Sequence, residues 1–249
     1  MSKLSKLRAK NIELARKGVK ESVNPDLFII NAVNNFEELQ RIINVLTKRL
    51  REWYSIYLPE LDKKIQDNEA YVKLVLKKDR KVLLNDLKLN STLGADMPKN
   101  HIKPMLLTAK SIDTLAKQIS ELEKYLEATM KAHCPNLTTL AGALIGAKLI
   151  KGAGSLKKLA MMRSSTIQLL GAEKAFFRHI KTGAKPPKYG YILHHPLVQK
   201  AKKSDKGRAA RALADKIFIC VRTDYFKGEY IADKLLKELE VRLHEDQSP

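Results

Sequence analysis

Cysteine, aromatic residues and long apolar runs are all scarce in this sequence. Cys134 and Cys220 lie far apart in the 249 residues and form neither a disulfide framework nor a metal-ligand motif. No apolar run approaches the roughly 18 residues of a membrane-spanning helix, and residues 1–18 contain no apolar signal segment. Aromatic residues make up 6% of the chain and charged residues 30%, which favours solvated helices over a β-sandwich. We therefore expect an intracellular, cytoplasmic protein without a membrane segment.

Acidic residues are scarce in one segment. Residues 134–216 contain 17 Lys and Arg against only 3 acids, Glu173, Asp205 and Asp215, so this segment has a net charge of +14. The rest of the chain contributes +6 to the total of +20. This density favours nucleic-acid binding over an incidental basic surface, because neutralising phosphates requires many cations in one place.

Apolar residues recur at heptad spacing after Pro25. They are Ile29, Phe36, Ile43, Leu50 and Tyr57, with Ala32, Leu39, Leu46 and Trp53 three residues behind the first four. The pattern predicts one long helix from about Asp26 to beyond Leu61 with a coiled-coil seam. Pro25 suits a helix start. Pro59 is expected to kink the helix rather than end it, because apolar spacing resumes at Leu61.

A second seam follows at Ile112, Ile119 and Leu126, interleaved with Leu115 and Leu122. Between the seams, residues 90–104 contain Gly94, Pro98 and Pro104 as expected helix breakers. Two such helices predict an antiparallel hairpin with its tip near residues 79–107. Two helices alone cannot bury both faces, so either the rest of the chain or a second copy covers them. Self-association at the tip of the hairpin is favoured, and its candidate residues are Ile43, Leu50, Trp53, Ile112, Ile119 and Leu126.

After residue 134 the sequence favours shorter helices. Asn136 is a candidate N-cap for the first of them. Further helices are expected at 155–162, 164–170, 205–226 and 229–244. The Pro-Pro pair within residues 183–190 excludes a helix there, and YGYIL at 189–193 is the best strand candidate but is short. The sequence therefore predicts an all-α fold: a long antiparallel coiled-coil hairpin followed by a compact helical domain.

No catalytic arrangement can be assembled from the sequence. GALIGAK (142–148) lacks the spacing and the trailing Ser or Thr of a nucleotide-binding P-loop. His194 and His195 are adjacent, so on a helix they point apart, and no Cys or carboxylate lies near at ligand spacing. A Schiff-base role for Lys174 requires an apolar site, which its charged neighbours disfavour. We expect a protein that is not an enzyme and binds neither a metal nor a cofactor.

The segment LLGAEKAFFRHIKTG (169–183) combines small, acidic, basic and aromatic residues. Its Gly-Ala pair is expected to end one helix, and Glu173 to lie in the first turn of the next, where its charge complements the helix dipole. Small residues at such a point allow a backbone or phosphate to approach closely. Positive charge comes from Lys174, Arg178 and Lys181. Phe176 and Phe177 have the ring faces that stack on bases, but a core position is favoured for at least one of them.

Four segments follow one another in the order and spacing of a known family. They are CPNLTTLAGALIGAKLIKGAGSLKKLA, STIQLLGAEKAFF, PPKYGYILHHP and KGRAARALADKIFICVR. Over residues 134–226 the sequence resembles the Nop domain, whose signature is GAEKA with its flanks. Residues 26–133 look like the coiled-coil domain that precedes it. The chain as a whole resembles the archaeal Nop family (Nop5/Nop56/Nop58-like) of box C/D guide ribonucleoproteins.

The resemblance implies three parts and a set of partners. Residues 1–23 look like the remnant helix of an N-terminal domain that is otherwise absent, 24–133 like the coiled-coil domain and 134–249 like the Nop domain. The implied role is a non-catalytic scaffold for RNA 2′-O-methylation. The implied partners are the kink-turn of a box C/D guide RNA, the ribosomal-type protein bound to it, fibrillarin through the N-terminal domain, and a second copy of the chain.

The resemblance also assigns residues. RNA contacts match Ser164, Lys188, Arg211 and Arg222, and the joint contact with RNA and the partner protein matches Gln168, Gly171, Ala172, Glu173 and Lys174. Arg211 and Arg222 are three helical turns apart and share a face, which Arg208 extends. A family lysine is replaced by Met161, and Arg163 is the candidate to replace its charge from a shifted position. The RNA-binding set is thus Arg163, Ser164, Lys174, Arg178, Lys188, Arg208, Arg211 and Arg222.

Two other functions fit parts of the same pattern. One is a spliceosomal-type Nop-domain assembly factor, which the GAEK sequence disfavours. The other is a structural dimerisation protein whose basic surface is incidental. Affinity for a kink-turn RNA, with and without its bound protein, separates the latter from the guide-ribonucleoprotein scaffold.

Overall fold

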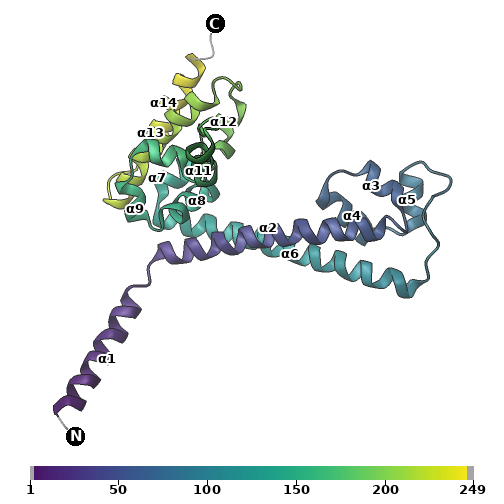
Figure 1. The fold of residues 1–249 in the computed structure, drawn as a ribbon, viewed down its shortest axis with the longest axis horizontal. Coiled ribbons are helices and arrows are strands. Elements are labelled where there is room, and N and C mark those ends of the chain that lie inside the picture. The colour runs from purple at the N-terminus through teal and green to yellow at the C-terminus, as the bar shows by residue number, and fades with distance from the viewer. Residues whose placement is uncertain (1–2, 246–249) are drawn as a thin grey trace. The chain divides into compact units, whose positions relative to one another are not determined.

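Helices make up every regular element in the described part of the chain, residues 3–245 of a computed structural model (Figure 1). This confirms the all-α prediction. The strand candidate at 189–193 instead contains a 3₁₀ helix, η1 (Tyr191–His194). None of the described helices combines the length and apolar character needed to cross a membrane. The chain divides into two compact units, residues 34–124 and, within the described part, residues 3–33 with 125–245.

The unit of residues 34–124 is built on the two predicted seams. It contains most of α2 (Pro25–Tyr54) and α6 (Lys99–His133), which run antiparallel, together with α3 (Pro59–Lys64), α4 (Asn68–Lys77) and α5 (Arg80–Asp86). Leu50, Tyr71 and Met105, from three different helices, are fully buried in its core. The hairpin therefore carries its own small core near the tip.

Two expectations about proline were wrong. Pro59 does not kink a continuous helix: α2 ends at Tyr54, and Pro59 begins α3 at a position where a missing N–H costs no helical bond. Pro104 does not break a helix, because α6 starts at Lys99 and continues through Pro104. Because proline has no N–H group, Pro104 removes one backbone hydrogen bond near the start of the long helix α6.

The coiled-coil seam of α2 drifts along the helix. Leu50 is buried as predicted, but Leu46 and Trp53 are partly or largely exposed, while their neighbours Thr47 and Tyr54 are buried. A straight α-helix has 3.6 residues per turn, so a seven-residue repeat rotates by about 20° per heptad. Along the line that begins at Ala32, the buried residue has moved on by one position after two to three heptads, to Thr47 and Tyr54, whereas Leu50, three heptads after Ile29, is still buried.

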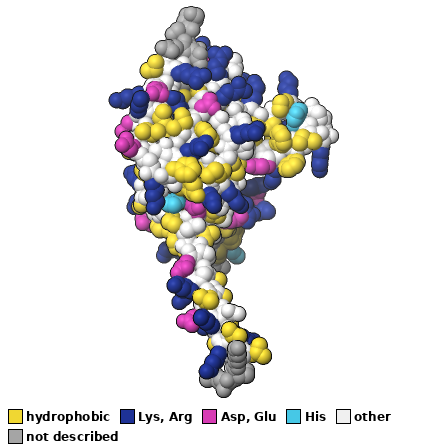
Figure 2. Space-filling model, turned by 90° about the vertical axis from the view of Figure 1, so that its left-hand side faces the viewer, with side chains coloured by type: hydrophobic (Ala, Val, Ile, Leu, Met, Phe, Trp, Pro, Cys, Tyr) yellow, Lys and Arg dark blue, Asp and Glu magenta, His cyan; other side chains and the backbone are white. Residues whose placement is uncertain are grey.

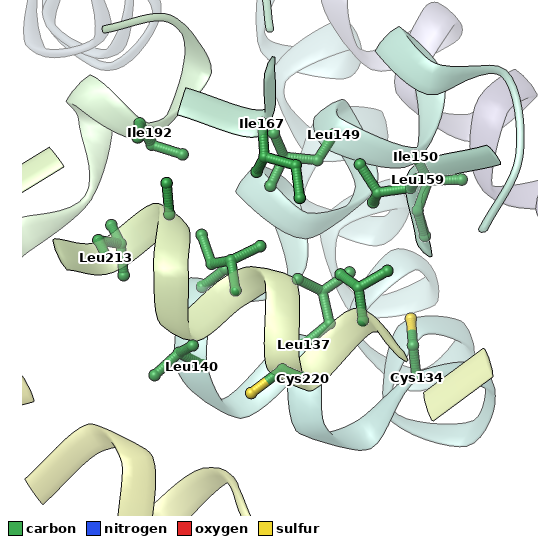
Figure 3. Close-up of a cluster of buried hydrophobic side chains, with 14 of the residues drawn as sticks. Cys134, Leu137, Leu140, Leu149, Ile150, Leu159, Ile167, Ile192, Leu213 and Cys220 are labelled. Carbon is green, nitrogen blue, oxygen red and sulfur yellow. The ribbon is translucent and has the colours of Figure 1, made fainter. Parts of the chain in front are cut away.

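The other unit surrounds helix α13 (Lys206–Tyr225). Packed against it are α7 (Pro135–Ala141), α9 (Leu156–Met161), α10 (Ser164–Leu169), α12 (Pro196–Lys200) and α14 (Ala232–Glu245). Figure 3 shows Leu213 and Cys220 of α13 in the same apolar cluster as Leu137, Leu140 and Ile167. Helix α8 (Ala143–Ala153) completes this core. It is separated from α7 by Gly142, whose φ of +81° ends the preceding helix.

Asn136 does not cap its own helix, contrary to expectation. Its Oδ1 accepts from the backbone N–H groups of Ile231 and Ala232, so it caps α14, which begins at Ala232. The start of α7 is capped instead by Asp224, which accepts from the backbone N–H groups of Asn136 and Leu137. These reciprocal caps tie the start of α7 to the end of α13 and the start of α14.

At the N-terminal side, α1 (Lys3–Glu21) is exposed along its described length. The beginning of α2 is fixed by Asp26, whose carboxylate binds His133 Nε2 at 2.7 Å and the backbone N–H of Leu156 at 3.0 Å. Burial alone raises the pKa of Asp26, but these two hydrogen bonds and the charge of His133 together lower it below its ordinary value.

Candidate nucleic-acid interface

The turn between α10 and α11 (Glu173–Thr182) is built around Gly171. Its φ is +89°, and a Cβ placed there would lie 2.7 Å from the ring of Tyr191, so both conformation and space require glycine. The backbone N–H of Gly171 donates to Glu173 Oε1 at 2.8 Å. Glu173 thus lies in the first turn of α11 as predicted, and its carboxylate holds the turn closed.

The loop after the Pro-Pro pair is fastened to the end of α10. Gln168 Nε2 donates to the carbonyl oxygen of Lys188 at 2.7 Å. Gly190 N–H donates to the carbonyl of Gln168 at 2.9 Å, and Tyr191 N–H to that of Leu170 at 2.7 Å. A Cβ at Gly190 would lie 1.8 Å from the Leu170 oxygen, so only glycine allows this approach. The turn and the loop therefore form one rigid unit.

This loop brings Lys188 to the start of α13. A Cβ at Gly207 would lie 3.3 Å from Lys188 Cδ, so the lysine side chain lies across the first turn of that helix. Arg211 follows Gly207 by one turn, and α10 packs along the same helix. The structure therefore brings together Gln168, Lys188 and the arginine end of α13, three parts of the predicted site.

One face of α13 carries Arg211 and Arg222, opposite its buried side. Both side chains are exposed, and Arg222 follows Arg211 by eleven positions, which is about three turns. Arg208 is also exposed. Asp215 and Phe218 lie on the same stripe, four and seven residues after Arg211, a spacing that the sequence itself contains. The cationic face is thus interrupted by one acid and one ring.

Helix α10 contributes Ser164 and Gln168, one turn apart and both partly exposed. Arg163 precedes the helix as an exposed N-cap residue without a side-chain cap bond, and Met161 is exposed too. Ser164 is the first residue of α10 rather than its cap. By contrast, α9 is capped by a serine, since Ser155 Oγ accepts from Lys158 N–H.

Helix α11 is amphipathic, but it buries no residue. Its basic stripe consists of Lys174, Arg178 and Lys181, spaced for one helical face. The expectation that at least one phenylalanine enters the core was wrong. Phe176 is 44% and Phe177 61% exposed, and the nearby Ile180 is 63% exposed. No neighbouring helix covers this apolar face within the described residues, so α11 offers cationic and apolar contacts together.

Figure 2 shows one face of the molecule, with Lys and Arg side chains spread over it and Asp and Glu between them. Of the two adjacent histidines, His194 is exposed and His195 serves the fold. His195 is buried, its Nε2 bonds to the Leu140 carbonyl at 3.0 Å, and its Nδ1 accepts from Leu197 N–H, capping α12. No group of His, Cys, Asp and Glu suited to a metal ion occurs among the residues that the structure describes.

The predicted self-association residues differ in accessibility. Leu50, Ile112 and Leu126 are buried within the chain itself, whereas Trp53 is 41% exposed and Ile43 and Ile119 are partly buried. A groove of about 730 Å³ within residues 34–124 runs between α2, α4 and α6 and includes Ile43 and Ile119 in its lining. Thr47 also lines it, and its Oγ1 is buried with no hydrogen-bond partner in the described part of the chain.

Comparison with known proteins adds a family to this geometry. A family model described as "Nop: snoRNA binding domain, fibrillarin" matches residues 35–245. The chain is 40% identical over 250 residues to a NOP5 family protein of Methanocaldococcus jannaschii, covering 94% of this chain and 60% of that one. It is 36% identical to nucleolar protein 56 of Saccharomyces cerevisiae over 254 residues, covering 92% of this chain and 50% of the relative.

Two further comparisons agree with these. Nucleolar protein 58 of Schizosaccharomyces pombe is 36% identical over 215 residues, which cover 80% of this chain and 42% of that protein. A solved structure of a fibrillarin/Nop5p complex shares the fold at a TM-score of 0.58 and 24% identity, covering 97% of this chain and 78% of that one. The chain spans 42 to 60% of the three relatives' lengths. With a family model matched from residue 35 to residue 245, the chain belongs to the Nop family.

Proposed function

We propose that this chain is a non-catalytic scaffold of a box C/D guide ribonucleoprotein. Its α7–α14 unit binds kink-turn RNA together with the protein bound to that kink-turn, and fibrillarin is the methyltransferase of the assembly. The observation that carries the proposal is the gathering of Lys188 and Arg211 beside the Gly171 turn, through Gln168 and Gly207. This cluster belongs to the segment whose net charge is +14.

The chemistry of this surface suits a composite RNA–protein target. Exposed arginines and lysines contact phosphates and carry positive charge toward a polyanion. The exposed apolar stripe of α11, with Phe177 and Ile180, has no role in phosphate binding and instead suits contact with a protein or an unstacked base. A ligand that is RNA on one side and protein on the other uses both stripes of α11.

A mobility-shift experiment tests this function. A box C/D RNA containing a kink-turn is titrated with this chain, with the kink-turn-binding protein present or withheld. We expect a stable complex only when that protein is present, and weaker binding for Lys188→Ala. The control Arg41→Ala, whose side chain pairs with Glu38 in the other unit, should bind as the wild type does. Equal binding to any RNA duplex would instead indicate an incidental basic surface.

Self-association is part of the same proposal. The groove between α2, α4 and α6 is bordered by Ile43 and Ile119, both partly buried in one chain, and by charged side chains such as Asp113 and Glu123. The buried Thr47 hydroxyl has no hydrogen-bond partner among the residues that the structure describes, and a buried hydroxyl without a partner costs free energy until a donor or acceptor reaches it. A second copy of the hairpin supplies apolar and polar groups of the same kind.

A further inference from the structure

Arg222 lies between two aromatic rings of its own helix and the turn that follows. Its guanidinium carbon is 5.3 Å from the centroid of the Phe218 ring and 6.0 Å from that of Phe226. Residues four apart on a helix are neighbours, so one ring lies a turn before the arginine and the other a turn after it. A guanidinium within about 6 Å of a ring is attracted by its electron-rich face.

The acid closest to Arg222 in sequence is used elsewhere. Asp224 accepts hydrogen bonds from the backbone N–H groups of Asn136 and Leu137 and from the Asn136 side chain, so it caps α7. Asp224 follows Arg222 by two residues, but its carboxylate is bound to the N-terminus of α7. Within the described part of the chain, the contacts of the Arg222 guanidinium are with rings, which leave its N–H groups available to an anion.

Phe226 lies beside the Arg222 guanidinium and not in the hydrophobic core. It is 59% exposed, and the ring of Tyr225 meets it edge to face at 5.0 Å with an interplanar angle of 73°. Such an edge-to-face contact restricts the ring without burying it. An exposed ring held in this way limits the conformations of the flexible arginine beside it.

We propose that Phe218 and Phe226 are positioning residues that hold the guanidinium of Arg222 on the exposed face of α13, ready to bind an RNA phosphate. This inference rests on the proposed function, in which Arg222 contacts the RNA. The rings reduce the side-chain entropy that the arginine loses on binding, so their contribution depends on Arg222 being present.

A double-mutant cycle tests the inference. Fluorescence anisotropy measures the affinity of the chain for a labelled box C/D kink-turn RNA carrying its kink-turn protein. The variants are Phe226→Leu, which removes the ring, Phe226→Tyr, which keeps it, and Arg222→Ala with and without Phe226→Leu. Thermal melts serve to check that each variant is folded. We expect the Phe226 variants to fold, because this side chain is mostly exposed.

We expect Phe226→Leu to weaken binding roughly two- to five-fold, the size of an exposed cation–π contact. Phe226→Tyr should bind as the wild type does. In the Arg222→Ala background, Phe226→Leu should have no further effect. An equal loss in both backgrounds would overturn the inference, because the ring would then contact RNA or protein itself. If Phe226→Leu leaves the RNA affinity unchanged while Arg222→Ala lowers it, the inference is overturned and the proposed function stands. If the wild-type protein itself fails to bind, the proposed function is overturned.

Discussion

At the scale of single residues, several side chains serve a different helix from the one that contains them. Asn136 caps α14 and Asp224 caps α7. The sequence marks both as capping types but cannot say which helix each one caps, because that depends on tertiary neighbours. Glu173 was predictable because its partner, the Gly171 N–H, lies two residues away. The exposure of Phe176 was not, since an amphipathic pattern does not show whether a neighbouring element exists to cover it.

His195 makes the stability of the fold depend on pH. Burial lowers its pKa, although the hydrogen bond to the Leu140 carbonyl opposes this. The folded state therefore takes up a proton at lower pH than the unfolded state. The free energy of unfolding should fall as pH drops below about 6.5, the ordinary histidine pKa, and level off below the folded-state pKa.

The measurement is urea unfolding of wild type and His195→Gln between pH 7.5 and about pH 5. Glutamine does not titrate but offers an amide N–H to the Leu140 carbonyl. We expect the variant to be less stable at neutral pH by about 1 kcal/mol, through loss of the α12 cap, and to lose less stability on acidification. An identical pH dependence in both proteins would show that His195 is not the titrating group.

At the scale of helices, the heptad pattern predicted α2 and α6 but not where they end. Pro59 was expected inside a helix because apolar spacing resumed beyond it; in fact the spacing belongs to the separate helix α3. Periodicity records which residues are buried and not whether the backbone between them is continuous. The seam drift to Thr47 and Tyr54 was predictable in principle from the mismatch between 3.6 and 3.5 residues per turn.

The exposed face of α13 makes a prediction about salt. Each phosphate contact releases about one counterion, so losing one cation lowers the slope of log affinity against log salt concentration by roughly 0.7 to 1. We expect this decrease for Arg211→Ala and for Arg222→Ala when RNA binding is measured from about 50 to 300 mM salt. Arg41→Ala is the matched control and should leave the slope unchanged. If the slope is unchanged in both variants, this face of α13 does not contact the RNA.

At the scale of the whole molecule, the chain presents a cationic surface and a half-covered hairpin seam, each in its own unit. The charge asymmetry of residues 134–216 and the family resemblance predicted the first from sequence alone. What they could not supply was the way the loop of residues 188–191 is fastened to α10. That arrangement depends on Gly190 and Tyr191, whose contacts lie about twenty positions away in the sequence.

Self-association through the hairpin seam is tested by sedimentation. Ile119→Asp places a charge in the groove between α2, α4 and α6, so burying it against a second copy becomes costly. We expect the wild type to sediment as a dimer at micromolar concentration and this variant as a monomer. Val241→Asp, on an exposed position of α14, is the control and should remain dimeric. A wild type that stays monomeric at high concentration would contradict the proposal.

Amide hydrogen exchange in α11 tests the central claim most directly, namely that the Gly171 turn and the helix after it meet RNA and protein together. Because α11 buries none of its residues, its amides should exchange quickly in the free chain. Adding the kink-turn RNA with its bound protein should slow exchange across residues 173–182, whereas RNA alone should have little effect. Unchanged exchange in α11, with protection confined to residues 34–124, would contradict the account.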